Sequence, residues 1–429
     1  MTKVQQAESY IHSRKAFTHA PGLAVMQRLM QRLGDPQKQL RYIHIAGTNG
    51  KGSVTAMTAA ILQRAGLKTG MSISPYVTDF RERFQINGQM IEPERLEQLV
   101  GRIRPQVEAM EQAGEGEVNE FELVNAAAFL WFYEEKCDVV CLEVGLGGRC
   151  DATNIIPPPL VTCITRIGLD HTAILGETVE QIAAEKCAII KPGTVVISYP
   201  EQPPQAAQVI RQTCEKQQVP LVIPDPEDLA MLECNLLQNH ANYGGYEVEL
   251  PMKGRWQGLH MAMAVEAALA LWRQGYPIED QAILDGLAEA KLPARMEILS
   301  LQPLILLDGS HNPDGIDALA GMIERSGLPK MHAVIGMLRD KACEEMLRRL
   351  SDCFDVVYTV SPASPRAMSA GQLAELARPY FDEVEPAADV AQALQKARVG
   401  VGRLKGLCVC GSLYLAGEAR KILLSDANN

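Results

Sequence analysis

Arg41-Tyr-Ile-His-Ile-Ala-Gly-Thr-Asn-Gly-Lys-Gly-Ser53 is an apolar run that leads directly into a glycine-rich loop with one lysine, and a helical pattern from Val54 to Ala65 follows it. Strand, glycine-rich loop, lysine and helix in this order are typical of a phosphate-binding loop, because freed backbone N–H groups and the positive end of the helix face the same point. The stretch therefore predicts a polyphosphate site with Lys51 as its cation. An ordinary strand-turn-helix connection is the alternative.

The spacing of this loop departs from the usual P-loop pattern. If Gly50-Lys51 is the final Gly-Lys pair, Gly52 stands where the magnesium-binding Ser or Thr would be. A hydroxyl ligand would then come from Ser53 or from another part of the chain.

Length and composition bound the class of protein. At 429 residues the chain exceeds the usual size of a single core, so we expect two domains. The 47% apolar and 22% charged residues are typical of a globular enzyme, and the net charge of -11 argues against broad nucleic-acid binding. The amino terminus has no apolar signal core, and the longest apolar stretch, Met261 to Trp272, is short and interrupted by Glu266. We therefore expect a cytoplasmic protein that does not bind membranes.

Short β-branched runs alternate with helical patterns along the chain, which predicts an α/β protein with mostly parallel sheets and helices on both faces. The expected strands are Tyr42–Ile45, Val139–Val144, Val161–Thr165, Val195–Ser198, Ile305–Leu307, Ala333–Ile335, Val356–Val360 and Leu407–Cys410. Asn87-Gly88, inside the alternating run Phe84–Ile91, predicts one antiparallel hairpin. A proline where a helical pattern ends, in Lys291–Met296, predicts domains at 1–294 and 295–429.

Polar residues that follow strands of the first domain are candidates for a site, because parallel sheets bind ligands at the carboxyl ends of their strands. Glu143 ends a buried run, where an acid is costly unless it is paired or binds a metal, and a salt bridge to a lysine or arginine such as Arg149 is the alternative to a metal. Asp170-His171 follows the next strand, although a single histidine is more often structural. Ser74 ends a third run and by itself would be only a turn residue.

Together these pieces resemble the folylpolyglutamate synthase and dihydrofolate synthase family, a branch of the ATP-dependent amide ligases that also includes the Mur enzymes. The resemblance covers nearly the whole chain and keeps the order of the family's motifs. It rests on Gly47–Ser53, Ser74-Pro75 with Glu82-Arg83, Glu143–Arg149 with Asp151–Asn154, Gly168–His171, Glu185-Lys186 with Ile189–Gly193, Asp308–Pro313 and Gly411–Tyr414.

The resemblance implies a P-loop ATPase domain with a mostly parallel sheet and a smaller Rossmann-like α/β domain at the carboxyl end. It also implies a reaction in which ATP phosphorylates a carboxylate and L-glutamate attacks the acyl phosphate. Folates, dihydropteroate or both would be the acceptors, and we expect a monomer whose partners are small molecules, with no nucleic acid among them.

Residue roles follow from the same resemblance. ATP would contact Thr48, Asn49, Gly50, Lys51, Gly52, Ser53, His260, Arg295 and Asp308. Two magnesium sites would use Ser74, Glu143, His171 and a carbamylated Lys186, which without the resemblance would be read as a solvated helix lysine. Lys51, Lys186, His171 and His311 would be catalytic, and Arg83, Phe121, His311 and Ser412 would bind substrate.

One segment departs from the family pattern. Gly254-Arg-Trp-Gln-Gly-Leu-His260 places Trp256 where the family has histidine and His260 where it has the nucleotide-contacting asparagine. Imidazole lacks the paired donor and acceptor of an amide, so the contacts to adenine are open. Two other functions also stay open. One is a Mur-type ligase acting on a nucleotide-linked sugar peptide; such ligases usually carry an extra amino-terminal domain, whereas only about 40 residues precede the phosphate loop here. The other is a non-catalytic nucleotide-binding switch.

Overall fold

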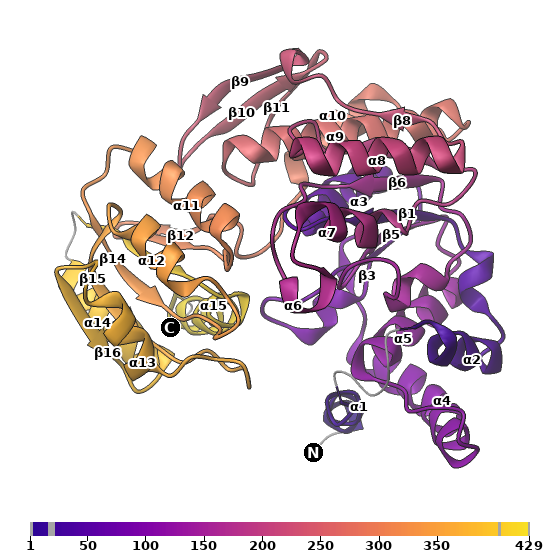
Figure 1. Ribbon diagram of the computed structural model, residues 1–429, viewed down its shortest axis with the longest axis horizontal. Coiled ribbons are helices and arrows are strands. Elements are labelled where there is room, and N and C mark those ends of the chain that lie inside the picture. The colour runs from indigo at the N-terminus through magenta and orange to yellow at the C-terminus, as the bar shows by residue number, and fades with distance from the viewer. Residues whose placement is uncertain (1–2, 16–21, 402–404, 428–429) are drawn as a thin grey trace.

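The computed structural model describes residues 3–15, 22–401 and 405–427 and has two α/β parts, with a small antiparallel sheet at one edge of the space between them (Figure 1). The strands are β1 (Tyr42–Ala46), β2 (Thr69–Ser72), β3 (Gln85–Ile86), β4 (Gln89–Met90), β5 (Val139–Glu143), β6 (Val161–Ile164), β7 (Val195–Ser198), β8 (Leu221–Val222), β9 (Leu229–Cys234), β10 (Asn239–Tyr243), β11 (Tyr246–Glu249), β12 (Glu297–Leu301), β13 (Leu304–Leu307), β14 (Met331–Ile335), β15 (Phe354–Thr359), β16 (Glu383–Pro386) and β17 (Leu407–Cys410).

The helices alternate with these strands in the order that parallel sheets require. They are α1 (Lys3–His12), α2 (Ala24–Arg32), α3 (Lys51–Arg64), α4 (Pro93–Gln112), α5 (Glu120–Glu134), α6 (Thr172–Leu175), α7 (Val179–Cys187), α8 (Pro204–Gln217), α9 (Arg255–Arg273), α10 (Asp280–Glu289), α11 (Pro313–Arg325), α12 (Cys343–Leu350), α13 (Ala370–Ala377), α14 (Val390–Val401) and α15 (Leu413–Ala427). Among the described residues, none of these helices has the length and apolar character needed to span a membrane.

The first sheet has the strand order β4-β3-β2-β5-β1-β6-β7-β8, and all its neighbours pair in parallel except β2 with β3 and β3 with β4. Strand β1 is buried on both faces: Ile43 and Ile45 pack with α3, α9 and α10, whereas Tyr42 packs with α2, α4 and α5. Because β5 and β6 flank β1, the loops after these three strands meet at one edge of the sheet.

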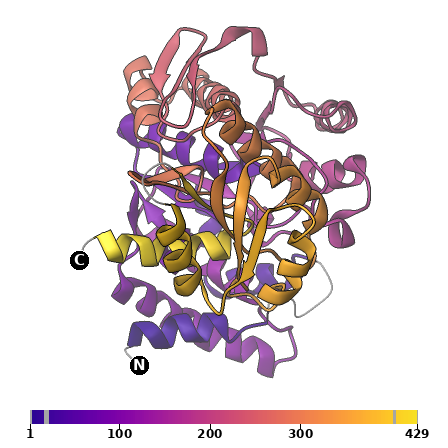
Figure 2. The ribbon, with the colours of Figure 1, turned by 90° about the vertical axis from the view of Figure 1, so that its left-hand side faces the viewer.

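The second sheet has the order β12-β13-β17-β14-β15-β16, with β12 antiparallel to β13 and the other neighbours parallel. Helices α11, α12 and α13 cover one face, and α14 and α15 cover the other. Figure 2 shows this second part edge on, in front of the first. The predicted α/β class with two mostly parallel sheets is confirmed, as is each expected strand to within two residues at its ends.

The first part contains a short hairpin that the sequence predicted, and the chain also forms a small antiparallel sheet that it did not. The hairpin β3-β4 forms as predicted, and Asn87 and Gly88 at its turn both have positive φ, at 48° and 70°. The antiparallel sheet β11-β10-β9 was not predicted. Gly244-Gly245, with φ of 58° and 96°, make the β10-β11 turn and were its available sequence signal.

Candidate functional site

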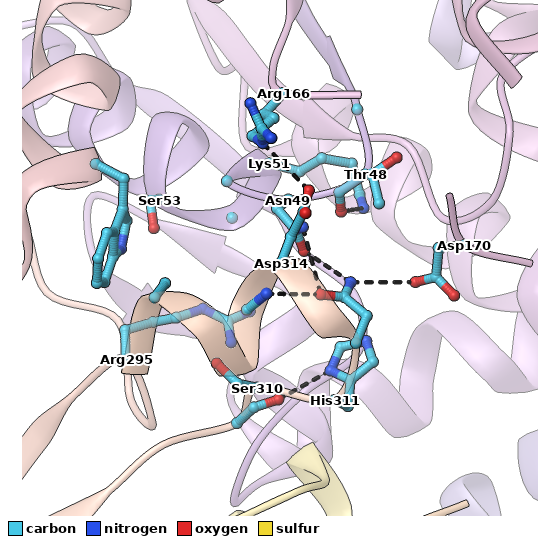
Figure 3. Close-up of a pocket in the computed structure, with 18 of the residues that line it drawn as sticks. Thr48, Asn49, Lys51, Ser53, Arg166, Asp170, Arg295, Ser310, His311 and Asp314 are labelled. Carbon is cyan, nitrogen blue, oxygen red and sulfur yellow. Dashed lines mark hydrogen bonds and ion pairs between the residues drawn. The ribbon is translucent and has the colours of Figure 1, made fainter. Parts of the chain in front are cut away.

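A cavity of about 590 Å³ lies between the two α/β parts, at the carboxyl ends of β1, β5, β6 and β13. Most of the residues predicted for the site line it: Thr48, Asn49, Gly50, Lys51, Gly52, Ser53, Ser74, Glu143, His171, Lys186, His260, Arg295, Asp308 and His311. The side chains come from loops far apart in the sequence and point toward one another (Figure 3). The site is thus built jointly by the two sheets.

The phosphate loop joins β1 to α3, whose first residue is Lys51. Gly50 has φ of 91°, a conformation that favours glycine, and this turn allows the helix to begin at the loop. Thr48 fixes the loop to the strand-end segment after β6, because its N–H donates to the carbonyl of Arg166 at 2.8 Å and its hydroxyl donates to that of Gly168 at 3.1 Å. The Lys51 ammonium donates to the Thr48 carbonyl at 3.3 Å and keeps further protons for a ligand.

Glu143 ends β5 and is only 6% exposed. Burial raises the pKa of its carboxyl group, and the charge of Lys51 opposes this increase. Its Oε2 accepts a hydrogen bond from the backbone N–H of Ser74 at 3.2 Å. The alternative of a salt bridge to Arg149 is wrong, because that guanidinium pairs with Glu185 at 2.8 Å instead.

Lys186 lies in α7 with 5% of its surface exposed, so the reading as a solvated helix lysine is wrong. Its ammonium nitrogen donates to the carbonyl of Gly47 at 2.8 Å. Burial, helped by the positive charge of Lys51, lowers the pKa of Lys186 to about 7. A substantial fraction of this amine is therefore neutral at neutral pH.

Two histidines face the cavity from opposite sheets. His171 follows β6 in the left-handed conformation, with φ of 51°. His311 follows β13, and its Nδ1 lies 2.9 Å from the carbonyl oxygen of Gly309, which assigns the ring proton to Nδ1 and leaves Nε2 as an acceptor. Burial lowers the pKa of each to about 4, so both are neutral at physiological pH.

Asp308 sits at the end of β13 and holds the turn that carries His311. Its two oxygens accept backbone hydrogen bonds from Ser310 at 2.8 Å and from Met296 at 2.9 Å. Burial raises the pKa of this carboxyl group, and these hydrogen bonds with the charge of Arg295 oppose the increase. The acid therefore fixes the residue that follows Arg295 and the residue that precedes His311.

His260 lies in the first turns of α9 and packs against the phosphate loop. Its Nδ1 is 3.1 Å from Oε1 of Gln257, and a Cβ atom added to Gly50 would lie 2.1 Å from its Nε2. Burial lowers the pKa of His260 to about 3, so the ring is neutral. Trp256 also lines the cavity and packs against the apolar cluster of the second sheet.

Three predicted substrate residues do not line this cavity among the described residues. Arg83 lies beside the rings of Tyr76 and Phe80, at 5.4 and 5.7 Å from their centroids, and its Nε finds no hydrogen-bond partner in the described part of the chain. Phe121 touches Gly145 of the cavity wall, where an added Cβ would lie 2.4 Å from its ring. Ser412 is buried, and its hydroxyl accepts from the N–H of Tyr414 at 3.2 Å.

Several residues that join the two parts were not singled out from the sequence. They are Arg166, Asn312, Asp314 and Lys341, together with Asp170, which the sequence singled out only as the neighbour of His171. Arg166, Asp170 and Asp314 are labelled in Figure 3. Asn312 lay inside a recognised motif, which was its available signal. Lys341 had none, because its partner is 171 residues away in the chain.

Comparisons with known proteins agree with this architecture. The model of the Mur ligase middle domain matches residues 45–265, and that of the Mur ligase glutamate ligase domain matches residues 294–413. A dihydrofolate synthase/folylpolyglutamate synthase of Bacillus subtilis is 38% identical, covering 98% of this chain and 99% of the relative. That of Escherichia coli is 32% identical, covering 97% and 94%.

Solved structures give the same result. A Mycobacterium tuberculosis folylpolyglutamate synthase complexed with ADP superposes with a TM-score of 0.90 at 30% identity, covering 98% of each chain. E. coli FolC in complex with DHPP and ADP superposes with a TM-score of 0.86 at 29% identity, covering 99% of this chain and 98% of that one. The chain therefore belongs to the folylpolyglutamate and dihydrofolate synthase family of the ATP-dependent Mur ligases, and the family predicted from the sequence motifs is confirmed.

Proposed function

We propose that this enzyme uses ATP to join L-glutamate to folates, and also to dihydropteroate, through an acyl phosphate. The observation that carries this proposal is the single cavity in which the phosphate loop of one sheet faces Asp308, His311 and Arg295 of the other. A cavity between two parts can exclude water, which an acyl phosphate requires. Two structural relatives of this protein are complexed with ADP, which supports nucleotide binding by this chain.

In this mechanism Lys51 and the N–H groups at the start of α3 hold the transferred phosphate and stabilise the charge that develops on it. His311, neutral with Nε2 as an acceptor, is suited to accept a hydrogen bond from the ammonium group of glutamate and so to orient it. Arg83 and Phe121 would hold the pterin substrate beyond Gly145, and Ser412 would support the amino-acid end.

The residues predicted for magnesium fit such an ion by their chemistry. Ser74, Glu143, His171 and Lys186 line one cavity and include a buried carboxylate, the kind of oxygen ligand that magnesium prefers. When bound, the ion would neutralise charge on the phosphates of ATP. We propose that Lys186 is carbamylated, because the lowered pKa provides the neutral amine that reaction with carbon dioxide needs, and the resulting anion would supply a second oxygen site.

The first test is the release of ADP by the purified protein with Mg-ATP and L-glutamate, comparing dihydropteroate, tetrahydrofolate and no pterin, with products identified by mass. Release with both pterins, together with a mass increase of one glutamate, supports both activities. Release with only one pterin shows that this pterin alone is the substrate. No release with either would contradict the proposal and favour a Mur-type substrate or a nucleotide switch. We further propose that the enzyme is cytoplasmic and works as a monomer. Sedimentation of the purified protein measures its oligomeric state.

A further inference from the structure

Asn312 is the point where the two parts of the protein meet in front of the phosphate loop. Its Oδ1 accepts from the N–H of Gly315 at 2.9 Å and so caps the start of α11. Its Nδ2 donates to Oδ1 of Asn49 at 2.9 Å, and Nδ2 of Asn49 lies 3.4 Å from Oδ1 of Asn312. Asn312 is only 4% exposed, and Asn49 is partly buried, so the Asn312 end of this amide pair is sheltered from water.

The same amide reaches a second loop of the first part. Nδ2 of Asn312 lies 3.4 Å from Oδ2 of Asp170, whose other oxygen accepts from the ammonium group of Lys341, in the loop between β14 and α12. The Asp170 and Lys341 side chains are 11% and 5% exposed. The carboxylate of Asp170 is therefore paired with the ammonium group of Lys341 across the cleft, in a sheltered position.

A third contact lies on the solvent side of these two. Arg166 donates to Asp314 at 3.1 Å, and a Cβ atom added to Gly168 would lie 2.8 Å from Oδ2 of Asp314. The first turn of α11 thus rests directly on the segment after β6. Because this ion pair is about one third exposed on each side, its main effect is to close the edge of the contact rather than to add stability.

Each partner in the first part adjoins a residue already placed in the site. Asn49 precedes Gly50 and Lys51 of the phosphate loop, and Asp170 precedes His171. We propose that Asn312 is a positioning residue for the ligase reaction: its amide couples the docking of the second part to the conformation of the phosphate loop and of the His171 loop. This inference rests on the proposed function for its kinetic consequence, and on the geometry alone for its structural one.

The test is Asn312→Ser. Serine is a good helix cap and can keep the hydrogen bond to Gly315, but it is too short to span the cleft to Asn49 and Asp170. We expect thermal stability close to that of the wild type, a kcat for glutamate-dependent ADP release that is about ten- to a hundredfold lower, and a larger radius of gyration of the ligand-free protein in X-ray scattering. Asn242→Ser, whose side-chain hydrogen bonds to Gly245 and Glu247 stay within the β10-β11 hairpin, is the control and should change none of these.

Asn49→Ser removes the other half of the same amide pair and serves as a second variant. If the two asparagines act through each other, the double variant should be no slower than the slower single variant. Multiplicative losses of kcat, or an unchanged radius of gyration in both single variants, would overturn the coupling. A wild-type protein without glutamate-dependent turnover would instead refute the proposed function, and the scattering data would still decide the inference.

Discussion

At the scale of single residues, Lys51 is the cation on which phosphate binding depends. It lies in the wall of the cavity and donates to the carbonyl of Thr48 in its own loop, and its charge opposes the raised pKa of the buried Glu143 carboxyl group. We expect Lys51→Ala to lower turnover by at least about a hundredfold, as the loss of one preorganised charge does in other sites. The fold should stay intact, and the free energy of unfolding should fall by only about 1 kcal/mol, because Glu143 loses a neighbouring positive charge. ADP release measures the turnover, and thermal unfolding measures the stability. Lys216→Ala, at an exposed position, is the control. Retained turnover in Lys51→Ala would contradict the phosphate role.

Lys186 makes the stability of the protein depend on pH. Its pKa is about 7 in the folded protein and 10.5 when unperturbed, so between these values the unfolded chain binds one more proton than the folded one. Stability must then rise with pH over this window, by at most about 1.4 kcal/mol per pH unit, and the effect is absent below pH 7. We expect the free energy of unfolding of the wild type to increase from pH 7 to 9 relative to that of Lys186→Met, measured with urea in bicarbonate-free buffer. A constant difference would show that the buried amine does not lose its proton.

His260 could act by supporting the phosphate loop or by contacting the adenine base, and a ligand without a nucleobase separates these two roles. Its ring fills the space beside Gly50, so its replacement by a smaller side chain loosens the support of the phosphate loop. We expect His260→Asn to weaken the binding of ATP and of inorganic tripolyphosphate by similar factors, about tenfold for the loss of one buried contact. Calorimetric titration of both ligands makes the comparison. Weaker binding of ATP alone would show that His260 contacts the base and not the loop.

At the scale of whole elements, helix α15 contacts the loop between β2 and β3 so closely that only a glycine fits. A Cβ atom added to Gly417 would lie 1.7 Å from the carbonyl oxygen of Val77. We expect Gly417→Ala to destabilise the protein by about 1–3 kcal/mol, because the helix or the loop must move. Gly101→Ala, inside α4 with no atom within 4 Å of the added carbon, is the control and should stabilise by about 0.5–1 kcal/mol. Equal effects in chemical unfolding would show that the contact is unimportant.

The elements also show what a sequence can predict. Runs such as Val139–Glu143 were recognisable because a strand buried on both faces must be apolar throughout, and the loop Gly47–Ser53 because its chemistry is local. In the sheet of β9, β10 and β11, β9 is a mostly apolar run that is not buried, and β10 and β11 mix polar with apolar residues, so the residue pattern was weak there. The ion pair of Asp170 with Lys341 depends on how two distant loops meet, which no local pattern encodes.

At the scale of the whole molecule, the two α/β parts have separate apolar cores, and the site lies where those cores end. Ile43 and Ile45 belong to a cluster of the first sheet, whereas Leu306 and Ile335 belong to a cluster of the second. Apolar contacts that reach across include Leu236 of the β9-β10 turn, which packs with the second cluster. The contacts in front of the phosphate loop are polar and contribute less net free energy than an apolar core of similar area.

This separation predicts how the ligand-free protein unfolds. If each sheet unfolds with its own core, scanning calorimetry should show two overlapping transitions, and the calorimetric enthalpy should exceed the van't Hoff enthalpy of a single one. Mg-ADP bound between the two parts at about 100 times its Kd should stabilise the protein by about 2.7 kcal/mol and bring the transitions together, because neither part can unfold without releasing the ligand. Lys51→Ala should keep both transitions and lose most of the shift with ADP. A single two-state transition without ligand would contradict this prediction and would mean that the polar contacts, with Leu236, are enough to make the two sheets one cooperative unit.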